Sequence, residues 1–184
     1  MRTMIISDLH GSEQTTRQAL KYFGELNCDR LLILGDILYH GPRNPIPQGH
    51  NPKGVVELLN PLKDKIIAVR GNCEAEVDQM LLEFPCMADY ALIEEEGIRI
   101  FATHGHLYNP GKLPFLPTGA LFLYGHTHLW EVCREKGITI CNPGSITLPK
   151  QGREATFAIY EAGIISVHRL EDGVRLASLP VKEA

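Results

Sequence analysis

The sequence predicts an α/β fold in which two β-sheets pack together with helices on the outside. In the first half of the chain, short apolar runs alternate with segments of helical periodicity, which is typical of βαβ units. From Met87 onward, short β-rich runs are separated by glycine turns, which is typical of hairpins and indicates a mostly antiparallel half. No linker, repeat or low-complexity segment separates the halves, so we expect one domain over residues 1–184.

The first half is expected to form three strands and three helices. Ser12 is a suitable N-cap for the first helix, whose apolar residues recur at near-helical spacing. A right-handed crossover should connect the first two strands. Residues 39–52 contain four prolines and two glycines, which exclude regular structure and are typical of a loop that is either functional or disordered. The expected strands are 4–6, 30–34 and 65–69, and the expected helices are 12–27, 52–59 and 74–82.

The second half is expected to consist of strands joined by tight turns. Four dipeptides that end in glycine should form these turns: Glu96-Gly97, Lys136-Gly137, Ala162-Gly163 and Asp172-Gly173. The strands expected around them are 89–94, 98–103, 120–124, 130–134, 138–141, 156–160, 164–168 and 174–179.

Composition narrows the class of protein and its partners. The formal net charge is −4 without any block of like charges, so long nucleic acid, which is held through its phosphates, is a poor default partner. A small anionic substrate is compatible with this negative net charge, because bound dications would reverse the local electrostatic field. The five cysteines lack the close spacing of a zinc knuckle or redox pair. We therefore expect reduced thiols, no membrane-spanning segment, no signal peptide and a cytoplasmic location.

Side chains of the kinds that bind metal ions follow five of the apolar runs. Because α/β sheets place their active sites at strand ends, we expect these groups to gather in one site. Oxygen and nitrogen ligands without a thiolate suit divalent ions such as Mn²⁺, Fe²⁺ or Zn²⁺. The pattern indicates a two-metal enzyme. The five clusters are Asp8 with His10, Asp36, Asn72, His104 with His106, and His126 with His128.

Spacing gives three of these residues specific roles. Asp8 and His10 are two positions apart, so in an extended segment they project to the same side and can chelate one ion. Asp36 can bridge two metal sites with its two oxygens. Any one cluster alone would be typical of a turn or a helix cap. Two His-x-His pairs after strands, with both aspartate motifs upstream, favour a shared metal site.

The order of these motifs resembles the calcineurin-like metallophosphoesterases. The resemblance covers residues 8–128, and the later Asn142-Pro143-Gly144-Ser145 string is similar to that of the family's small prokaryotic branch. It implies a four-layer αββα sandwich of two mixed β-sheets, and hydrolysis of phosphate esters by in-line attack of a metal-bridging hydroxide. It also implies two divalent ions per chain, with Mn²⁺ the expected occupant and Fe²⁺, Zn²⁺, Ni²⁺ or Co²⁺ as alternatives.

The resemblance also assigns the ligands by motif position. The first metal takes Asp8, His10, Asp36 and His128, and the second takes Asp36, Asn72, His104 and His126. We interpret the chain as a phosphodiesterase acting on a small phosphodiester. Two alternatives stay open: a phosphomonoesterase acting on a nucleotide or sugar phosphate, and a non-catalytic metal-binding scaffold for protein interactions.

One position departs from the family pattern. Many members carry a histidine that protonates the leaving group, and Cys73 stands at that position here. Cysteine, with a reference pKa of about 8.5, is a poor replacement acid. We therefore expect good leaving groups to be favoured, with His106 or His40 as the substitute proton donor.

The loop at residues 39–51 follows Asp36 directly, so it should begin at the mouth of the site. Arg43 can offer a bidentate fork to a phosphate, and Asn44 can hydrogen-bond beside it. The alternative for Arg43 is a solvated surface position.

The Asn142–Ser145 string is expected to form a structural turn, with orientation of a ligand as the lesser possibility. The apolar run at residues 113–117, if exposed, would mark a subunit or partner contact, and a homo-oligomer is compatible with the sequence.

Overall fold

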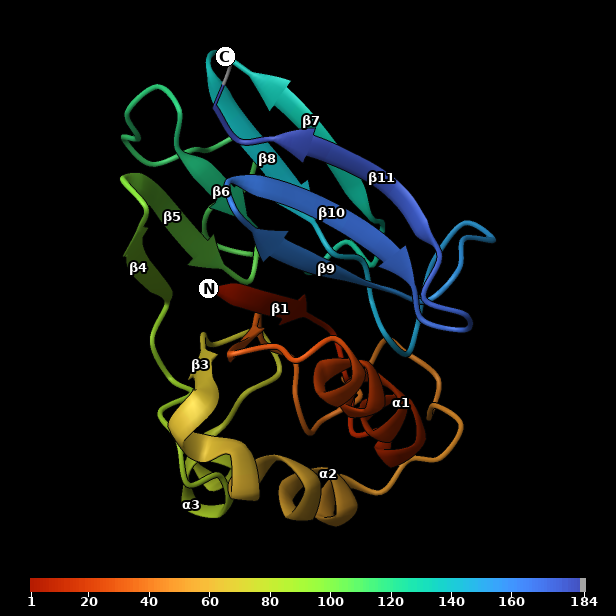
Figure 1. Ribbon diagram of the computed structural model, residues 1–184. Helices are drawn as coiled ribbons and strands as arrows, with labels where there is room; N and C mark the ends of the chain where they lie inside the picture. The colour runs from red at the N-terminus through yellow and green to blue at the C-terminus, as the bar shows by residue number, and fades with distance from the viewer. Residues whose placement is uncertain (183–184) are drawn as a thin grey trace.

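Two mixed β-sheets pack face to face in the computed structural model, which describes residues 1–182 (Figure 1). The first sheet has the order β11-β10-β9-β1-β2-β3, and the second has the order β4-β5-β6-β8-β7. The strands of the first sheet are β1 (Arg2–Ile6), β2 (Arg30–Ile33), β3 (Ile66–Ala68), β9 (Thr156–Glu161), β10 (Ile164–Arg169) and β11 (Arg175–Pro180). Those of the second are β4 (Tyr90–Glu95), β5 (Ile98–Thr103), β6 (Leu121–Leu123), β7 (Glu131–Glu135) and β8 (Ile138–Asn142).

The N-terminal half has the βαβαβ order that the sequence predicts. Its strands β1, β2 and β3 are parallel neighbours. Ser12 caps the first helix as expected, because its Oγ accepts a hydrogen bond from the backbone N–H of Thr15 at 3.4 Å. Residues 39–51 form no helix or strand, apart from an isolated bridge between His50 and Ser12. The helices are α1 (Glu13–Glu25), α2 (Pro52–Leu59) with a 3₁₀ extension (Asn60–Lys65), and α3 (Glu76–Leu81).

Three of the predicted glycine dipeptides close tight hairpins. Both residues of each turn have positive φ, as in Glu96 (51°) with Gly97 (71°) and Ala162 (48°) with Gly163 (74°). Lys136 and Gly137 close the β7–β8 hairpin in the same way. Positive φ at both central positions is the type I′ geometry that matches the twist of antiparallel strands. These hairpins are confirmed.

The prediction of a mostly antiparallel second half is correct only in part. Strands β5, β6 and β8 pair in parallel at the centre of the second sheet. Strands β9 to β11 do not join that sheet and instead extend the first one, where β9 pairs antiparallel with β1. Strand partners are selected by packing between distant segments, so local patterning could not identify them.

Apolar side chains fill three layers around the sheets. Phe23 of α1 and Leu59 of α2 pack with one face of the first sheet, which the helices cover (Figure 1). The sheets meet through residues such as Ile5 and Leu121. The outer face of the second sheet, which includes Phe122, is covered by the long segment 104–120. Among residues 1–182, this fourth layer is therefore a loop, whereas the other three match the expected sandwich.

The apolar segment in this covering loop is divided between core and surface. Leu116 is buried against the second sheet, whereas Phe115 is 95% exposed. A fully exposed phenyl ring is compatible with the contact to another chain that the sequence suggested. None of the helices in the described part of the chain is long and apolar enough to cross a membrane.

Candidate metal centre

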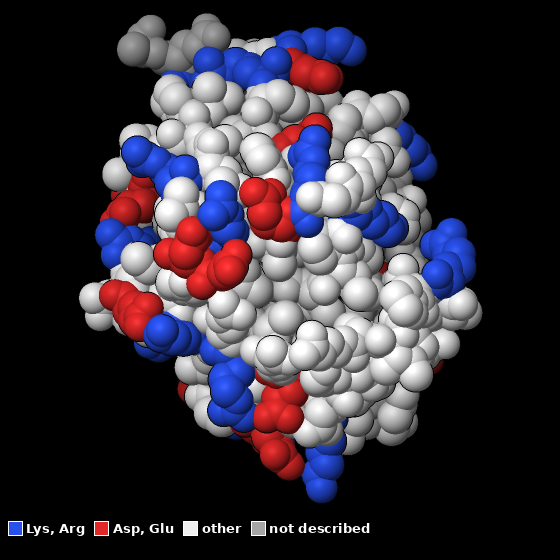
Figure 2. All heavy atoms as spheres, turned by 90° about the vertical axis from the view of Figure 1, so that its right-hand side faces the viewer, with Lys and Arg blue, Asp and Glu red and all other residues white. Residues whose placement is uncertain are grey.

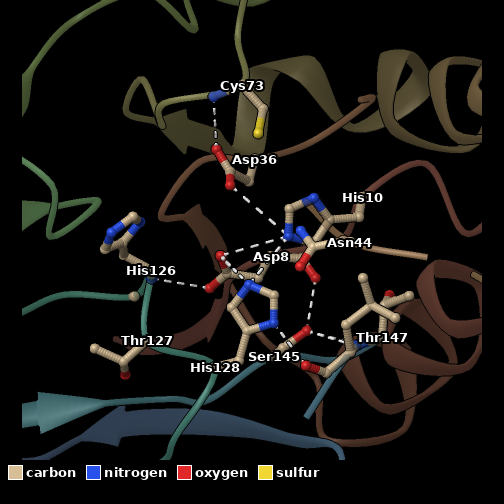
Figure 3. A network of polar contacts seen from close by, with 12 residues as sticks. Asp8, His10, Asp36, Asn44, Cys73, His126, Thr127, His128, Ser145 and Thr147 are labelled. Atoms are coloured by element: carbon tan, nitrogen blue, oxygen red, sulfur yellow. Dashed lines mark hydrogen bonds and ion pairs between the residues drawn. The ribbon is translucent and has the colours of Figure 1, made fainter. Parts of the chain in front are cut away.

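The seven side chains proposed as metal ligands come together where strands of both sheets end. Asp8 and His10 follow β1, Asp36 follows β2, and the other four follow β3, β5 and β6. Figure 3 shows four of them pointing toward one another: Asp8, His10, Asp36 and His128. His126 lies beside them, and its backbone N–H donates to Oδ2 of Asp8. Parallel strands direct their carboxyl ends to one edge of a sheet, which explains the convergence.

Four of these residues form a first group. The Nε2 atom of His10 lies 3.2 Å from Nε2 of His128, 3.8 Å from Oδ1 of Asp8 and 3.7 Å from Oδ2 of Asp36. The Nε2 atom of His128 is 3.3 Å from the same Asp8 oxygen. Donor atoms of Asp8, His10 and His128 all lie within 4.8 Å of one another, which is compact enough to surround one ion.

Asp36 also belongs to a second group. Its Oδ1 lies 3.5 Å from Nε2 of His104, which is itself 3.2 Å from Oδ1 of Asn72. The Nδ1 atom of His126 completes the group at 3.2 Å from the same His104 nitrogen. One Asp36 oxygen thus faces each group, which is the arrangement expected of a bridging carboxylate.

The buried polar atoms of this cluster fit a divalent cation. Oδ1 of Asp8 is fully buried and has no hydrogen-bond partner, although His128 Nε2 lies nearby. An unpaired buried carboxylate oxygen is costly, and a cation in the first group would compensate it. Carboxylate, imidazole and amide donors suit the borderline divalent ions. The residues present therefore fit a divalent metal ion.

Hydrogen bonds to backbone carbonyls fix the orientation of three histidines. The Nδ1 atoms of His10, His104 and His128 lie 2.9, 2.7 and 2.6 Å from the carbonyl oxygens of Tyr39, Leu34 and Leu148. An Nδ1–H that donates to these oxygens leaves the Nε2 lone pair directed at the centre, as a metal ligand requires. His126 differs because it presents Nδ1 to the cluster.

The charge states of Asp8, His10 and His126 also favour metal binding. Burial lowers the pKa of His10 and of His126, so both imidazoles are neutral and free to bind a cation at neutral pH. Burial would raise the pKa of Asp8, but the neighbouring imidazoles of His128, His104 and His10 outweigh it and hold that pKa below its usual range. Deprotonated ligands of this kind are a precondition for tight metal binding.

Five of the seven proposed ligands share an uncommon backbone conformation that the sequence did not reveal. Positive φ is unfavourable for residues other than glycine, and it occurs with functional sites when the surrounding structure enforces it. Here the loop geometry presents the side chains to the centre at the cost of local strain. The φ values are 56° at Asp8, 48° at His10, 53° at Asp36, 68° at His126 and 62° at His128.

Glu74 ties together the loops that carry Asp36 and Asn72, and sequence reasoning did not identify it as a site residue. Its carboxylate accepts hydrogen bonds from the backbone N–H groups of Asp36 at 3.0 Å, Ile37 at 2.6 Å and Gly71. Burial and the neighbouring Asp36 charge raise the pKa of Glu74 to about 7. Its position two residues after Asn72 was the feature of the sequence that could have identified it as a site residue.

The turn at residues 142–145 supports two ligand loops. Ser145 Oγ donates to the carbonyl oxygen of Asp8 at 2.8 Å and accepts from the N–H of Leu148 at 2.8 Å. Asn142 Nδ2 donates to the carbonyl oxygen of Gly125 at 2.9 Å and to Oγ1 of Thr127 at 3.0 Å. The turn is structural, as expected, and its contacts also hold the segments that bear the ligands.

A cavity of about 410 Å³ opens onto the metal centre. Arg43 and Asn44, which were predicted to contact substrate, both line it. Lys150 and Thr127 line it as well, although neither was predicted to do so. Thr127 lies between the ligands His126 and His128, whereas no local pattern connects Lys150 to the ligand motifs. An exposed arginine and an exposed lysine therefore border the space next to the ligands, where an anion would be attracted.

The two candidate proton donors occupy different places. The His106 ring lies beside the second group, with its centroid 5.4 Å from that of His104 and 6.3 Å from that of His126. His40 instead packs edge-on against Tyr39 in the loop that follows β2, 4.8 Å between centroids.

Cys73 lies directly beside the Asp36 carboxylate. Its N–H donates to Oδ1 of Asp36 at 2.9 Å, and its Sγ accepts from Asn72 Nδ2 at 3.2 Å. Burial, together with the Asp36 charge, raises the pKa of this thiol well above its usual range. Sγ also lies within 4.8 Å of donor atoms of His10 and Asp36, so the thiol borders the metal centre.

Comparison with known proteins agrees with this geometry. The phosphodiesterase YfcE of Escherichia coli K12 is 44% identical over 182 residues, which are 98% of each chain. The solved structure of E. coli YfcE, described as a phosphoesterase, superimposes with a TM-score of 0.97 and covers 99% of this chain and 100% of that one. Vacuolar protein sorting 29 of Cryptosporidium parvum shares the fold alone, with a TM-score of 0.63 at 18% identity, covering 99% and 98%.

The family assignment rests on the chain as a whole. The model of the calcineurin-like phosphoesterase superfamily domain matches residues 1–163. This match spans every ligand motif described above, from Asp8 to His128, and the turn at residues 142–145. The chain therefore belongs to the calcineurin-like phosphoesterase superfamily.

Proposed function

We propose that this protein is a metal-dependent phosphodiesterase with two divalent ions, Mn²⁺ being the expected pair, held by the seven ligands of the candidate centre. The observation that carries the proposal is the position of Asp36, whose two oxygens face the two ligand groups at 3.7 and 3.5 Å. Bound in this way, two dications lower the pKa of water and stabilise the charge that develops on phosphoryl oxygens.

The protein's own side chains would position the substrate. Arg43 and Lys150 border the cavity and can bind non-bridging phosphate oxygens, and Asn44 can hydrogen-bond beside them. Asn44 is already oriented, because its Nδ2 donates to the carbonyl oxygen of His40 at 2.8 Å. These groups would bind a small phosphodiester and hold its phosphorus against the metal centre.

The preference for a diester over a monoester rests on two observations. The E. coli relative at 44% identity is named a phosphodiesterase. The cavity also continues beyond Arg43 and Asn44 into a second pocket, which leaves room for groups on the phosphate. We expect Mn²⁺-loaded protein to hydrolyse bis-p-nitrophenyl phosphate with a kcat/KM at least about tenfold above that for p-nitrophenyl phosphate. Release of p-nitrophenolate measures both rates, and a preference for the monoester would make a phosphomonoesterase the better assignment.

We propose His106 as the proton donor to poor leaving groups, because it lies beside the second ligand group. In a series of methyl aryl phosphate diesters, His106→Ala should slow esters of weakly acidic phenols by about 10²-fold and leave the p-nitrophenyl ester nearly unchanged. The measurement is the slope of log kcat against the pKa of the leaving phenol. His40→Ala is the matched variant. A slope that steepens only in His40→Ala would transfer the role to that residue.

A non-catalytic scaffold is the second candidate, since proteins of this fold include vacuolar protein sorting 29. That similarity, at 18% identity, concerns the fold alone. The full ligand set and the buried, unpaired oxygen of Asp8 favour an enzyme. A protein that binds two Mn²⁺ per chain but turns over neither ester would reverse this preference.

The proposal extends to location and partners. All five cysteines are free thiols, which supports a reducing, cytoplasmic compartment.

On the face toward which β1 points, basic and acidic residues are interspersed and leave a broad uncharged area (Figure 2). Such a surface lacks the basic stripe that long nucleic acid requires. The exposed Phe115 supports a contact with a second copy of the chain.

A further inference from the structure

An apolar groove lies between the loop that follows β2 and helix α3, and we call it the α3 groove. Tyr39, His40 and His50 line one side, and Val77 and Leu81 of α3 line the other. Its volume is about 430 Å³, similar to that of the cavity at the metal centre. Val77 is 56% exposed and Leu81 is 50% exposed, so their side chains are accessible to a ligand.

The groove is continuous with the metal centre. A pocket of about 390 Å³ lies between them. It shares Arg43, Asn44 and Asn72 with the cavity at the metals. It shares Tyr39, Cys73 and Ala75 with the α3 groove. A phosphate at the metal centre could therefore carry a substituent that passes Ala75 and enters the groove.

The walls of the groove suit a planar aromatic ring. The His40 ring meets Tyr39 at 63° and His50 at 86°, with centroid separations of 4.8 and 5.3 Å. Edge-to-face clusters of this kind accept a further aromatic ring. Nδ1 of His40 and Nε2 of His50 are buried without hydrogen-bond partners. These two nitrogens are inaccessible, so the surface that the groove offers to a ligand is aromatic and apolar.

We propose that the α3 groove binds an aromatic group that is esterified to the phosphate of the substrate. The phosphate would lie at the metal centre, and the connecting atoms would pass between Asn72 and Ala75. This inference rests on the proposed function and adds the chemical class of one ester group. It makes Tyr39, His40 and Val77 determinants of specificity rather than groups that take part in bond cleavage.

Binding of simple phosphonates to the Mn²⁺-loaded full chain tests the proposal without turnover. The probes are methylphosphonate, phenylphosphonate and 2-phenylethylphosphonate, which share the anion and differ in the ring and its reach. We expect at least one aryl probe to bind about tenfold more tightly than methylphosphonate in isothermal titration calorimetry. Equal affinity of all three for the wild-type protein would overturn the proposal.

Two tryptophan substitutions, one at the N-cap of α3 and one on the helix, test whether the aryl ring binds in the α3 groove. Ala75→Trp should fill the junction and abolish the aryl preference, while the Kd of methylphosphonate changes by less than about threefold. Met80→Trp adds the same side chain to α3 at a position that is 82% exposed and outside the groove. It should preserve the preference. An aryl preference that survives in Ala75→Trp would show that the ring binds elsewhere.

The result is separable from the test of the proposed function. Diester turnover with no aryl preference in binding would overturn the groove and leave the phosphodiesterase assignment standing. Ring-dependent binding that Ala75→Trp removes, in a protein without diester turnover, would support the groove as a ligand site and overturn the phosphodiesterase assignment. Val77→Ser, which reduces the apolar surface without blocking the path, should lower the preference only partly.

Discussion

Replacing Asp36 with asparagine is expected to lower kcat for bis-p-nitrophenyl phosphate by about 10³-fold or more. Asp36 presents one oxygen to each ligand group, at 3.7 Å from His10 and 3.5 Å from His104. Asparagine keeps the size of the side chain but removes its charge and exchanges one oxygen for an NH₂ group, which cannot bind a cation. The substitution should therefore remove the negative charge that the two ligand groups share, while the fold persists.

The measurement combines turnover with metal content. Metal-stripped wild-type protein should be inactive, and activity should return on titration with Mn²⁺ until two ions are bound per chain. Asp36→Asn should bind fewer ions and recover little activity. Asp64→Asn is the matched control, because Asp64 is exposed and lies in the 3₁₀ helix that precedes β3, at the opposite end of that strand from Asn72. If metal-stripped protein kept full activity, or if Asp36→Asn kept it, the two-metal proposal would fail.

Gly71→Ala is the second substitution with a large expected effect. A Cβ atom at this position would lie 2.1 Å from Oδ1 of Asp36, 2.5 Å from its backbone nitrogen and 2.7 Å from Oε2 of Glu74. These distances are far inside van der Waals contact, so the loops that carry Asp36 and Asn72 must separate. We expect a loss of about 2–3 kcal/mol in the free energy of unfolding.

Activity should fall together with stability in this variant. Displacement of Asp36 should reduce kcat by about 10²-fold, because errors near 1 Å in a catalytic site have effects of this size. Chemical denaturation and Mn²⁺-dependent turnover measure the two effects. Gly24→Ala makes the same change in α1, where nothing lies within 4 Å of the added atom. That control should be as stable as the wild type or slightly more stable. A Gly71→Ala protein with wild-type metal affinity and turnover would contradict the close packing described here.

Much of the local structure was encoded in short stretches of sequence. The α2 helix begins at Pro52 and ends at Leu59 as predicted, because proline suits the first helical turn and apolar residues follow at helical spacing. The hairpin at Glu96-Gly97 was predictable because glycine readily adopts the positive φ that the second position of this turn requires. The family, too, was evident from the order of the ligand motifs, which the superfamily match over residues 1–163 confirms.

The pairing of distant strands was not encoded locally. Strand β9 lies beside β1 although more than a hundred residues separate them, and β6 pairs in parallel with both β5 and β8. Alternation of apolar residues identifies a strand and its buried faces but does not name its neighbour. For the same reason, the sequence did not show that segment 104–120, rather than a helix, covers the second sheet.

The same distinction between local and long-range information applies to the candidate site. The sequence by itself determined the ligand types and their order, because a carboxylate, an imidazole or an amide has its chemistry wherever it lies. Only the tertiary structure decided that one Asp36 oxygen faces each ligand group, that Glu74 joins the two loops, and that Lys150 borders the cavity. It also decided the positive φ angles at Asp8 and Asp36, which the surrounding contacts enforce against local preference. Those features depend on contacts between segments far apart in the chain, and no local pattern carries information about such contacts.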